Sequence, residues 1–256
     1  MIIGLAALMI YLFGGSAEML FLNPEIKKNV KTYVTDQQRK EDIYVIIKQI
    51  ETDQKSFLKK RKKVYAKKSS ELNLNYASKR RDFEKLFNVY FEERKKLQSS
   101  YVDSELKIRA MIKEEEWQKI IGTVLEKPDN EKAQNSYLKA SEKLFGDILK
   151  ACEENISNAT TQKEALRTVN EQKAEINHFV DEFLNLNYRN LESLRKLNAG
   201  RSDFELVTAE LNELRRKLLD HLIDMRFKLV DMTSEEEWKK LGKELDKLFS
   251  RGKNII

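Results

Sequence analysis

Apolar residues recur every three or four positions along most of the chain, which is the spacing of a helix that buries one face. Residues 80–112 and 162–198 carry stripes of this kind. A third stripe is almost unbroken and comprises Phe204, Val207, Leu211, Leu214, Leu218, Leu222, Met225, Leu229 and Met232. Strand-like alternation bounded by turn residues does not occur in the sequence. The pattern therefore predicts an all-α fold, in which long antiparallel helices cover one another's apolar faces.

The sparse turn residues agree with this fold class. The 256 residues include only 2 Pro and 8 Gly, which disfavours barrels, sandwiches and doubly wound sheets. Predicted helix starts are marked by capping boxes, in which a Ser or Thr is followed three residues later by Glu or Gln. These boxes are Thr35–Gln38, Thr161–Glu164, Ser202–Glu205 and Ser234–Glu237. The helices are predicted near residues 24–33, 36–72, 80–112, 114–124, 129–154, 162–198, 203–232 and 235–250.

The first 22 residues are apolar apart from Ser16 and Glu18. As a helix they span about 33 Å, enough for a bilayer core of about 30 Å. We interpret residues 1–22 as a single transmembrane anchor, with Glu18 near the interface rather than in an ion pathway. The alternative is a signal peptide cleaved after Ala17, although no basic residue precedes the apolar run. Because Lys and Arg follow it instead, the positive-inside rule favours a cytoplasmic large domain, and an envelope location is the alternative.

The rest of the chain contains an internal repeat. Residues 82–119 align without gaps to residues 203–240, an offset of 121, with 15 identical positions out of 38. Both copies open with Asp-Phe-Glu and end with Glu-Glu-Glu-Trp. We interpret this as an internal duplication. The predicted units are a first unit of residues 23–127 and a second unit of residues 128–256.

Four aromatic residues occupy matching positions in the two copies. We interpret them as structural, with each Trp packed on the helix before it and the glutamates of the first turn facing the positive end of the helix dipole. In the first unit Lys113 replaces the capping Ser234 of the second, so the helix there is predicted to continue from its predecessor. The four aromatic positions are Phe83, Trp117, Phe204 and Trp238.

A dense basic run lies in the first unit. Residues 1–128 carry 26 basic and 18 acidic side chains, against 22 and 24 in residues 129–256. One interpretation of this run is a solvated helix face. The other is a surface that contacts anionic lipid or an acidic protein partner. Nucleic acid is disfavoured, because the interleaved aromatics occupy core positions and no nucleic-acid fold signature is present. The candidate contact residues are Lys59, Lys60, Arg61, Lys62, Lys63, Lys67 and Lys68.

Residues that could carry catalysis are scarce. Cys152 is the single cysteine, which excludes an internal disulfide, and there is no phosphate-binding glycine loop. Glu175 and His178 have the Glu-x-x-His spacing of di-iron bundles, but no second copy exists, because Leu218 stands three residues before the other histidine, His221. His221 is predicted to contact Asp224 instead. We therefore assign no catalytic, metal-binding or cofactor-binding residue.

These patterns predict a protein that acts by binding. The expected function is a membrane-anchored helical scaffold, a tether or an accessory subunit of a membrane complex, with a protein partner and with homo-oligomerisation as a further option. The first alternative is an exported soluble helical protein, a binding or chaperone-like protein released by signal cleavage. A more remote alternative is a metal-dependent helical-bundle enzyme using Glu175, His178 and His221.

Overall fold

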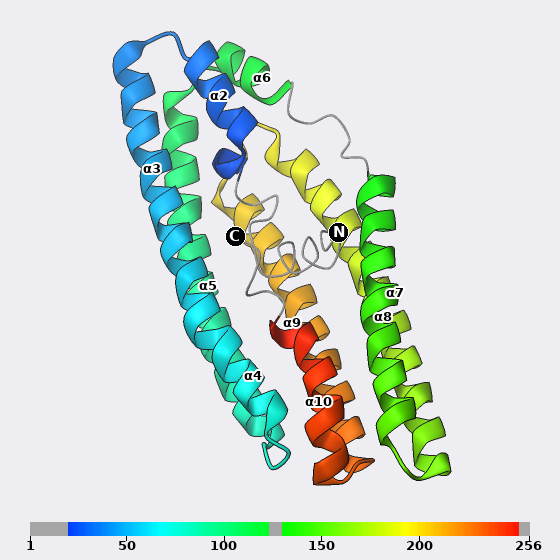
Figure 1. Cartoon of the computed structure of the whole chain (residues 1–256). Coiled ribbons are helices and arrows are strands. Elements are labelled where there is room, and N and C mark those ends of the chain that lie inside the picture. The colour runs from blue at the N-terminus through cyan, green and yellow to red at the C-terminus, as the bar shows by residue number, and fades with distance from the viewer. Residues whose placement is uncertain (1–19, 123–129, 251–256) are drawn as a thin grey trace.

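The computed structural model describes residues 20–122 and 130–250, excluding the side chains of residues 130–137, 140, 187–188, 191–193 and 248–250. Within these ranges the fold is all-helical and contains no strand, as predicted. Figure 1 shows long helices running side by side, with α3 and α4 along one edge and α7 and α8 along the opposite edge. In chain order the elements are η1 (Leu20–Leu22), α2 (Pro24–Tyr33), α3 (Gln37–Lys60), the π-helical turn η2 (Arg61–Tyr65), α4 (Ala66–Leu74), α5 (Arg80–Met111), α6 (Glu114–Gly122), α7 (Asn130–Asn155), α8 (Ala159–Leu194), α9 (Arg201–Asp231) and α10 (Glu235–Ser250).

Most helix ends lie within a few residues of their predicted positions, but three of the four predicted capping boxes are wrong. The side chain of Asp36 caps α3 by accepting a hydrogen bond from the Arg39 amide, 2.8 Å away. The side chain of Asn158 caps α8, because its carbonyl oxygen accepts from two backbone amides of the first turn, each at 3.0 Å. At α9 the Gly200 amide donates to Asp203 (2.8 Å). The true cap therefore lies one residue after the predicted one at α3, and three and two residues before it at α8 and α9.

The apolar stripes form the core, as predicted. In α9 every member of the predicted stripe is buried except Leu214 and Met232, which are partly buried. One cluster joins α7, α8, α9 and α10 to the end of α3, to η2 and to α5. A second cluster joins η1, α2, α3 and α6 to the other end of α5.

The bundle begins before the predicted end of the anchor. Leu20 and Phe21 are buried in the second cluster. The Phe21 amide donates to the Tyr101 hydroxyl (3.1 Å), and its ring lies 6.3 Å from that of Trp117. The predicted boundary at Leu22 is therefore too late, because these apolar side chains are covered by protein. Residues 1–19, on which the rest of the predicted anchor and Glu18 fall, lie outside the described residues.

None of the helices in the described ranges has both the length and the apolar character needed to cross a membrane.

Helices α5 and α9 pack against each other through contacts that repeat at an offset of 121 residues. Arg80 of α5 pairs with Asp224 of α9, and Arg201 of α9 pairs with Asp103 of α5. Arg80 and Arg201 are 121 residues apart, as are Asp103 and Asp224. The two ion pairs therefore exchange places when one helix is substituted for the other, as expected for an antiparallel pair around a local two-fold axis.

Candidate interaction surface

The basic run is built on a π-helical turn. Between α3 and α4, residues Arg61–Tyr65 form η2, and the Ala66 amide donates to the Arg61 carbonyl five residues earlier. A π turn accommodates one more residue than an α turn. The predicted single helix of residues 36–72 is therefore interrupted at the segment where the positive charge is densest.

The wider turn keeps inward-facing residues at a constant spacing of four. In an α-helix, residues four apart drift by about 40° around the axis, so five of them in succession cannot share one face. Here all five positions are buried, because η2 absorbs the drift. The inward row comprises Phe57, Arg61, Tyr65, Ser69 and Asn73.

Arg61 therefore does not belong to the surface that the sequence predicted. Its side chain is turned inward, and only 8 % of the residue is exposed. Burial lowers the pKa of the Arg61 guanidinium, an effect that the nearby Arg94 reinforces. The structural reason is the inward row, in which position 61 follows Phe57 by four residues.

The lysines of the run stay in solvent. Lys60 pairs with Glu93, and Lys67 lies 3.8 Å from Glu71. Within the part of the chain that the structure describes, the other four have no carboxylate within salt-bridge distance. We call the six exposed residues the lysine face: Lys59, Lys60, Lys62, Lys63, Lys67 and Lys68.

Beneath the lysine face, Glu93 of α5 fixes the turn to the bundle. Burial opposes its ionisation, but hydrogen bonds from Lys60 and Tyr65 outweigh that effect and hold the pKa of Glu93 below its ordinary value. Burial and the bond to Glu93 raise the pKa of the Tyr65 hydroxyl. The Tyr65 ring also meets that of Tyr90 edge-on, with centroids 5.3 Å apart. The π turn is thus held by a polar and an aromatic contact.

The corresponding helix of the second unit has no such turn. Upstream of η2, buried residues of α3 match buried residues of α8 at an offset of 122, as with Ile43 and Ala165 or Phe57 and Phe179. Downstream of η2 the offset is 121, as with Asn73 and Leu194. The π turn is therefore a one-residue insertion of the first unit relative to α8.

The four repeat aromatics are buried and pair across the two units. Trp117 of α6 and Phe204 of α9 lie on either side of Arg109, whose guanidinium carbon is 4.4 Å and 5.0 Å from the two ring centres. The Trp117 indole N–H donates to the Arg195 carbonyl (2.6 Å) in the segment before α9. Arg109 also donates to the Leu194 carbonyl (2.8 Å). Trp117 therefore fastens the first unit to the second.

The second pair mirrors the first. Trp238 of α10 and Phe83 of α5 surround Arg226, at 5.3 Å and 5.2 Å. The Trp238 indole N–H donates to the Asn73 carbonyl (3.1 Å) at the end of α4. Arg226 donates to the Asn75 carbonyl (2.7 Å), and burial lowers its pKa to about 10. Each Trp stacks on an arginine of the preceding helix and reaches a backbone carbonyl of the other unit.

The last glutamate of each Glu-Glu-Glu-Trp segment has a specific role. Glu116 accepts two hydrogen bonds from Arg39, each 2.9 Å, and one from the Lys113 amide (3.0 Å). Ile112 is extended and ends α5, and the bond from the Lys113 amide caps the start of α6, so the two helices are separate and the predicted continuation is wrong. Glu237 accepts from the Ser234 amide (2.9 Å) and the Ser157 hydroxyl (2.6 Å). These bonds lower the pKa of each carboxyl to about 2.

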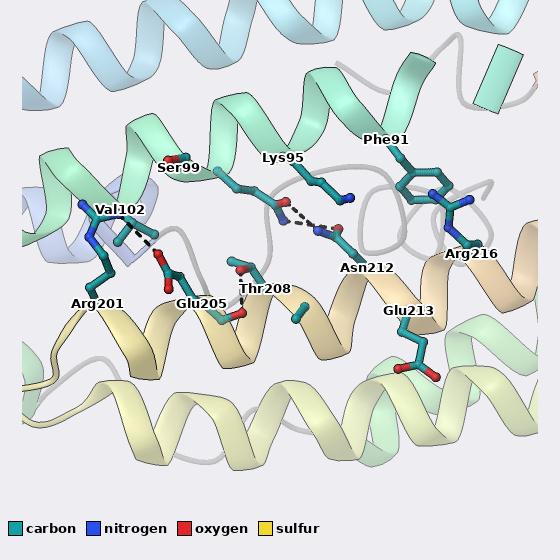
Figure 2. A pocket seen from close by; sticks show the side chains of 12 residues that line it. Phe91, Lys95, Ser99, Val102, Arg201, Glu205, Thr208, Asn212, Glu213 and Arg216 are labelled. Carbon is teal, nitrogen blue, oxygen red and sulfur yellow. Dashed lines mark hydrogen bonds and ion pairs between the residues drawn. The ribbon is translucent and has the colours of Figure 1, made fainter. Parts of the chain in front are cut away.

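A groove of about 420 Å³ lies between α5 and α9, close to their crossing. Figure 2 shows Asn212 of α9 pointing toward α5, where its side-chain nitrogen donates to the Gln98 side-chain oxygen (2.7 Å). Lys95 of α5 and Arg216 of α9 line the groove and are themselves 121 residues apart. Glu205 and Glu213 also line it, so its charges are mixed.

The residues considered for metal binding are not brought together. Glu175 and His178 are exposed on α8, where His178 lies 3.6 Å from Glu182. His221 packs against Phe179, with ring centres 5.1 Å apart. Asp224, the predicted neighbour of His221, pairs with Arg80. Among the described residues no three potential metal ligands form a group.

Several contact residues were missed by sequence reasoning. Arg109 and Arg226 do not occupy aligned positions, since they are 117 residues apart, although each serves the same role. The π turn was also missed. The sequence signal of the π turn is that matching residues of the two units are 122 positions apart before the turn and 121 after it. This change becomes visible only when the helices before residue 82 are aligned as well.

No known family model matches the chain, and neither curated proteins nor solved structures give a significant match.

Proposed function

We propose that the chain is a membrane-anchored helical scaffold, a tether or accessory subunit that acts by binding a protein partner. The observation that carries this proposal is the burial of Leu20 and Phe21, the last part of the apolar N-terminal sequence, in the core of the bundle. The Phe21 amide is also held by the Tyr101 hydroxyl. The apolar N-terminal sequence therefore leads directly into the packed body of the bundle.

The length of the remaining apolar segment fits the same proposal. With the buried Leu20 and Phe21 left out, the residues before them would span about 28 Å if they formed a helix, close to the bilayer core of about 30 Å. In this proposal residues 1–19 form the anchor, the folded domain is cytoplasmic, and Glu18 lies at the interface.

A duplicated architecture would give the scaffold its stiffness. The exchanged ion pairs between α5 and α9, and the two Trp residues that each reach the opposite unit, support an origin by duplication. Because each unit supplies part of the other's core, the units are expected to move as one body.

The test is recovery of the full-length chain from its native membrane after chemical cross-linking. The proposal predicts that the chain stays in the membrane fraction at alkaline pH and carries a stoichiometric protein partner. A chain that is extracted by alkali, or that is monomeric and free of cross-linked partners, contradicts it.

The groove between α5 and α9 favours the second candidate, an exported soluble binding protein. Its volume of about 420 Å³ falls within the range of small-molecule sites. This candidate requires cleavage near Ala17, so a mature chain that begins at Glu18 supports it over the anchored scaffold.

A further inference from the structure

We propose that the lysine face is a docking site for the anionic surface of the membrane, so that α3 and α4 lie along the bilayer. This proposal rests on the anchored scaffold proposed above and names a ligand for its basic surface.

The π turn arranges three lysines in one row. Lys59, Lys63 and Lys67 are four residues apart, like the buried row, and all three are exposed. Because η2 cancels the drift of residues spaced by four, these lysines follow one line along the helix. Two α-helical turns beyond Lys67, close to the same line, Leu74 is 43 % exposed. A row of lysines that ends in an exposed leucine suits the headgroup region of a bilayer.

The second unit shows that the helix does not need three of these charges. At the offset of 122, the positions of Lys59, Lys60 and Lys63 are held in α8 by Asp181, Glu182 and Asn185. The inward positions correspond, since Phe57 matches Phe179 and both are buried. The same kind of helix thus forms with acidic or neutral residues at these three positions, whereas Lys68 has a basic counterpart in Arg189 at the offset of 121.

The type of cation favours a lipid surface over nucleic acid. Every exposed cation of the run is a lysine, and its one arginine, Arg61, is buried. Arginine is the residue suited to bidentate phosphate recognition, whereas lysine acts as a hydrated point charge that fits a diffuse anionic surface. The aromatic residues of this segment, Phe57 and Tyr65, are buried as well, so they offer bases no stacking surface.

The position of the face fits an anchored chain. Leu22 and Ile50 line one small cavity, so the chain just after the apolar N-terminal sequence lies level with Ile50 on α3. Lys59 follows Ile50 by nine residues, or about 14 Å along the helix. A chain held in the membrane through residues 1–19 therefore keeps its lysine face near the lipid headgroups. Docking of this face would turn α7 and α8, on the opposite edge, away from the membrane (Figure 1).

The experiment measures lysine acetylation by a water-soluble reagent, residue by residue, with mass spectrometry. The full-length chain is reconstituted in vesicles of phosphatidylcholine alone or with 30 mol % phosphatidylserine (about a third of the lipid, a strongly anionic surface). We expect acetylation of the lysine face to fall at least about fivefold in the anionic vesicles and to recover in high salt, as electrostatic attraction requires. Exposed control lysines of the second unit are expected to react equally in both: Lys143, Lys150 and Lys239.

A matched pair of variants tests the row itself. In Lys59→Gln/Lys63→Gln/Lys67→Gln, the remaining Lys62 and Lys68 are expected to lose their protection in anionic vesicles. In the control Lys143→Gln/Lys150→Gln/Lys239→Gln they are expected to keep it. Because all six positions are exposed, both variants are expected to fold, and circular dichroism checks that they do.

The outcomes separate this proposal from the proposed function. If the chain floats with phosphatidylcholine vesicles but its lysines react equally with and without phosphatidylserine, docking is refuted and the anchor stands. If it floats only with anionic vesicles, in a salt-sensitive way, docking stands and the anchor fails. Failure to float with either refutes both. Protection by a single-stranded oligonucleotide but not by anionic vesicles also overturns the lipid assignment, in favour of nucleic acid.

Discussion

Replacement of Glu116 by Gln tests how α2, α3 and α6 are held together. The Glu116 carboxylate joins Arg39 of α3 to the Lys113 amide at the start of α6, and its side chain is 7 % exposed. Its pKa is about 2 instead of the ordinary 4.5. Each pKa unit corresponds to about 1.4 kcal/mol. The ionised carboxylate therefore contributes up to about 3 kcal/mol to the free energy of unfolding at neutral pH.

The pH dependence follows from the direction of the shift. Because folding lowers the pKa of Glu116, its contribution is fully present above the unfolded value, near 4.5, and is lost as the pH falls toward 2. The wild-type chain is thus expected to lose stability across this window. Glu116→Gln should remove that part of the pH dependence, while Glu237 continues to contribute its own part, since its pKa is also about 2.

The assay is thermal unfolding of the full-length chain in one non-ionic detergent, followed by circular dichroism from pH 7 to pH 3. At pH 7, Glu116→Gln is expected to lower the melting temperature by about 6–12 °C, at roughly 2–4 °C per kcal/mol. The matched control is Glu115→Gln, which changes an exposed carboxylate in the same helical turn. Equal melting temperatures for the two variants at pH 7, or an unchanged pH dependence in Glu116→Gln, would refute the reasoning.

Three further predictions concern the second unit. A Cβ atom at Gly242 would lie 3.0 Å from the Trp238 ring, so Gly242→Ala should lower the free energy of unfolding by about 1–3 kcal/mol in urea titrations. Gly146 has open space around it, so Gly146→Ala should raise the free energy of unfolding by about 0.5–1 kcal/mol in the same titrations. Trp238→Phe removes the bond to the Asn73 carbonyl and should cost about 1–3 kcal/mol in the same titrations; an unchanged midpoint would argue against the Trp contact between units. Burial raises the pKa of the Cys152 thiol to about 12, so iodoacetamide at pH 8 should label it only after denaturation, and rapid labelling of the native chain would contradict its burial.

The helices were predictable because each presents its apolar residues at helical spacing over many turns. Apart from the partly buried Leu214, the stripe from Phe204 to Leu229 is buried as its spacing predicts. The caps were less predictable, since Asp36 and Thr35 stand side by side and each is a good cap residue. Tertiary contacts decided between them, because the Thr35 amide donates to Glu116 of α6 (3.3 Å).

The interaction surface was only partly predictable. Charge density located the lysine face, but composition does not reveal which member of a basic run turns inward. Arg61 is buried because the π turn places it in line with Phe57 and Tyr65. Such a turn is invisible in a single helical stripe and becomes detectable only against the second unit. The arginines between the aromatic pairs were missed for a similar reason, since Arg109 and Arg226 reach equivalent places from different positions.

The most direct test of the central proposal is protease protection of a C-terminal tag in sealed vesicles, combined with N-terminal sequencing of the recovered chain. The anchored scaffold predicts an intact Met1 and a folded domain on the cytoplasmic side, digested only when protease has access to that side. A chain that begins at Glu18 and is released from the membrane would contradict the anchor and favour the exported binding protein.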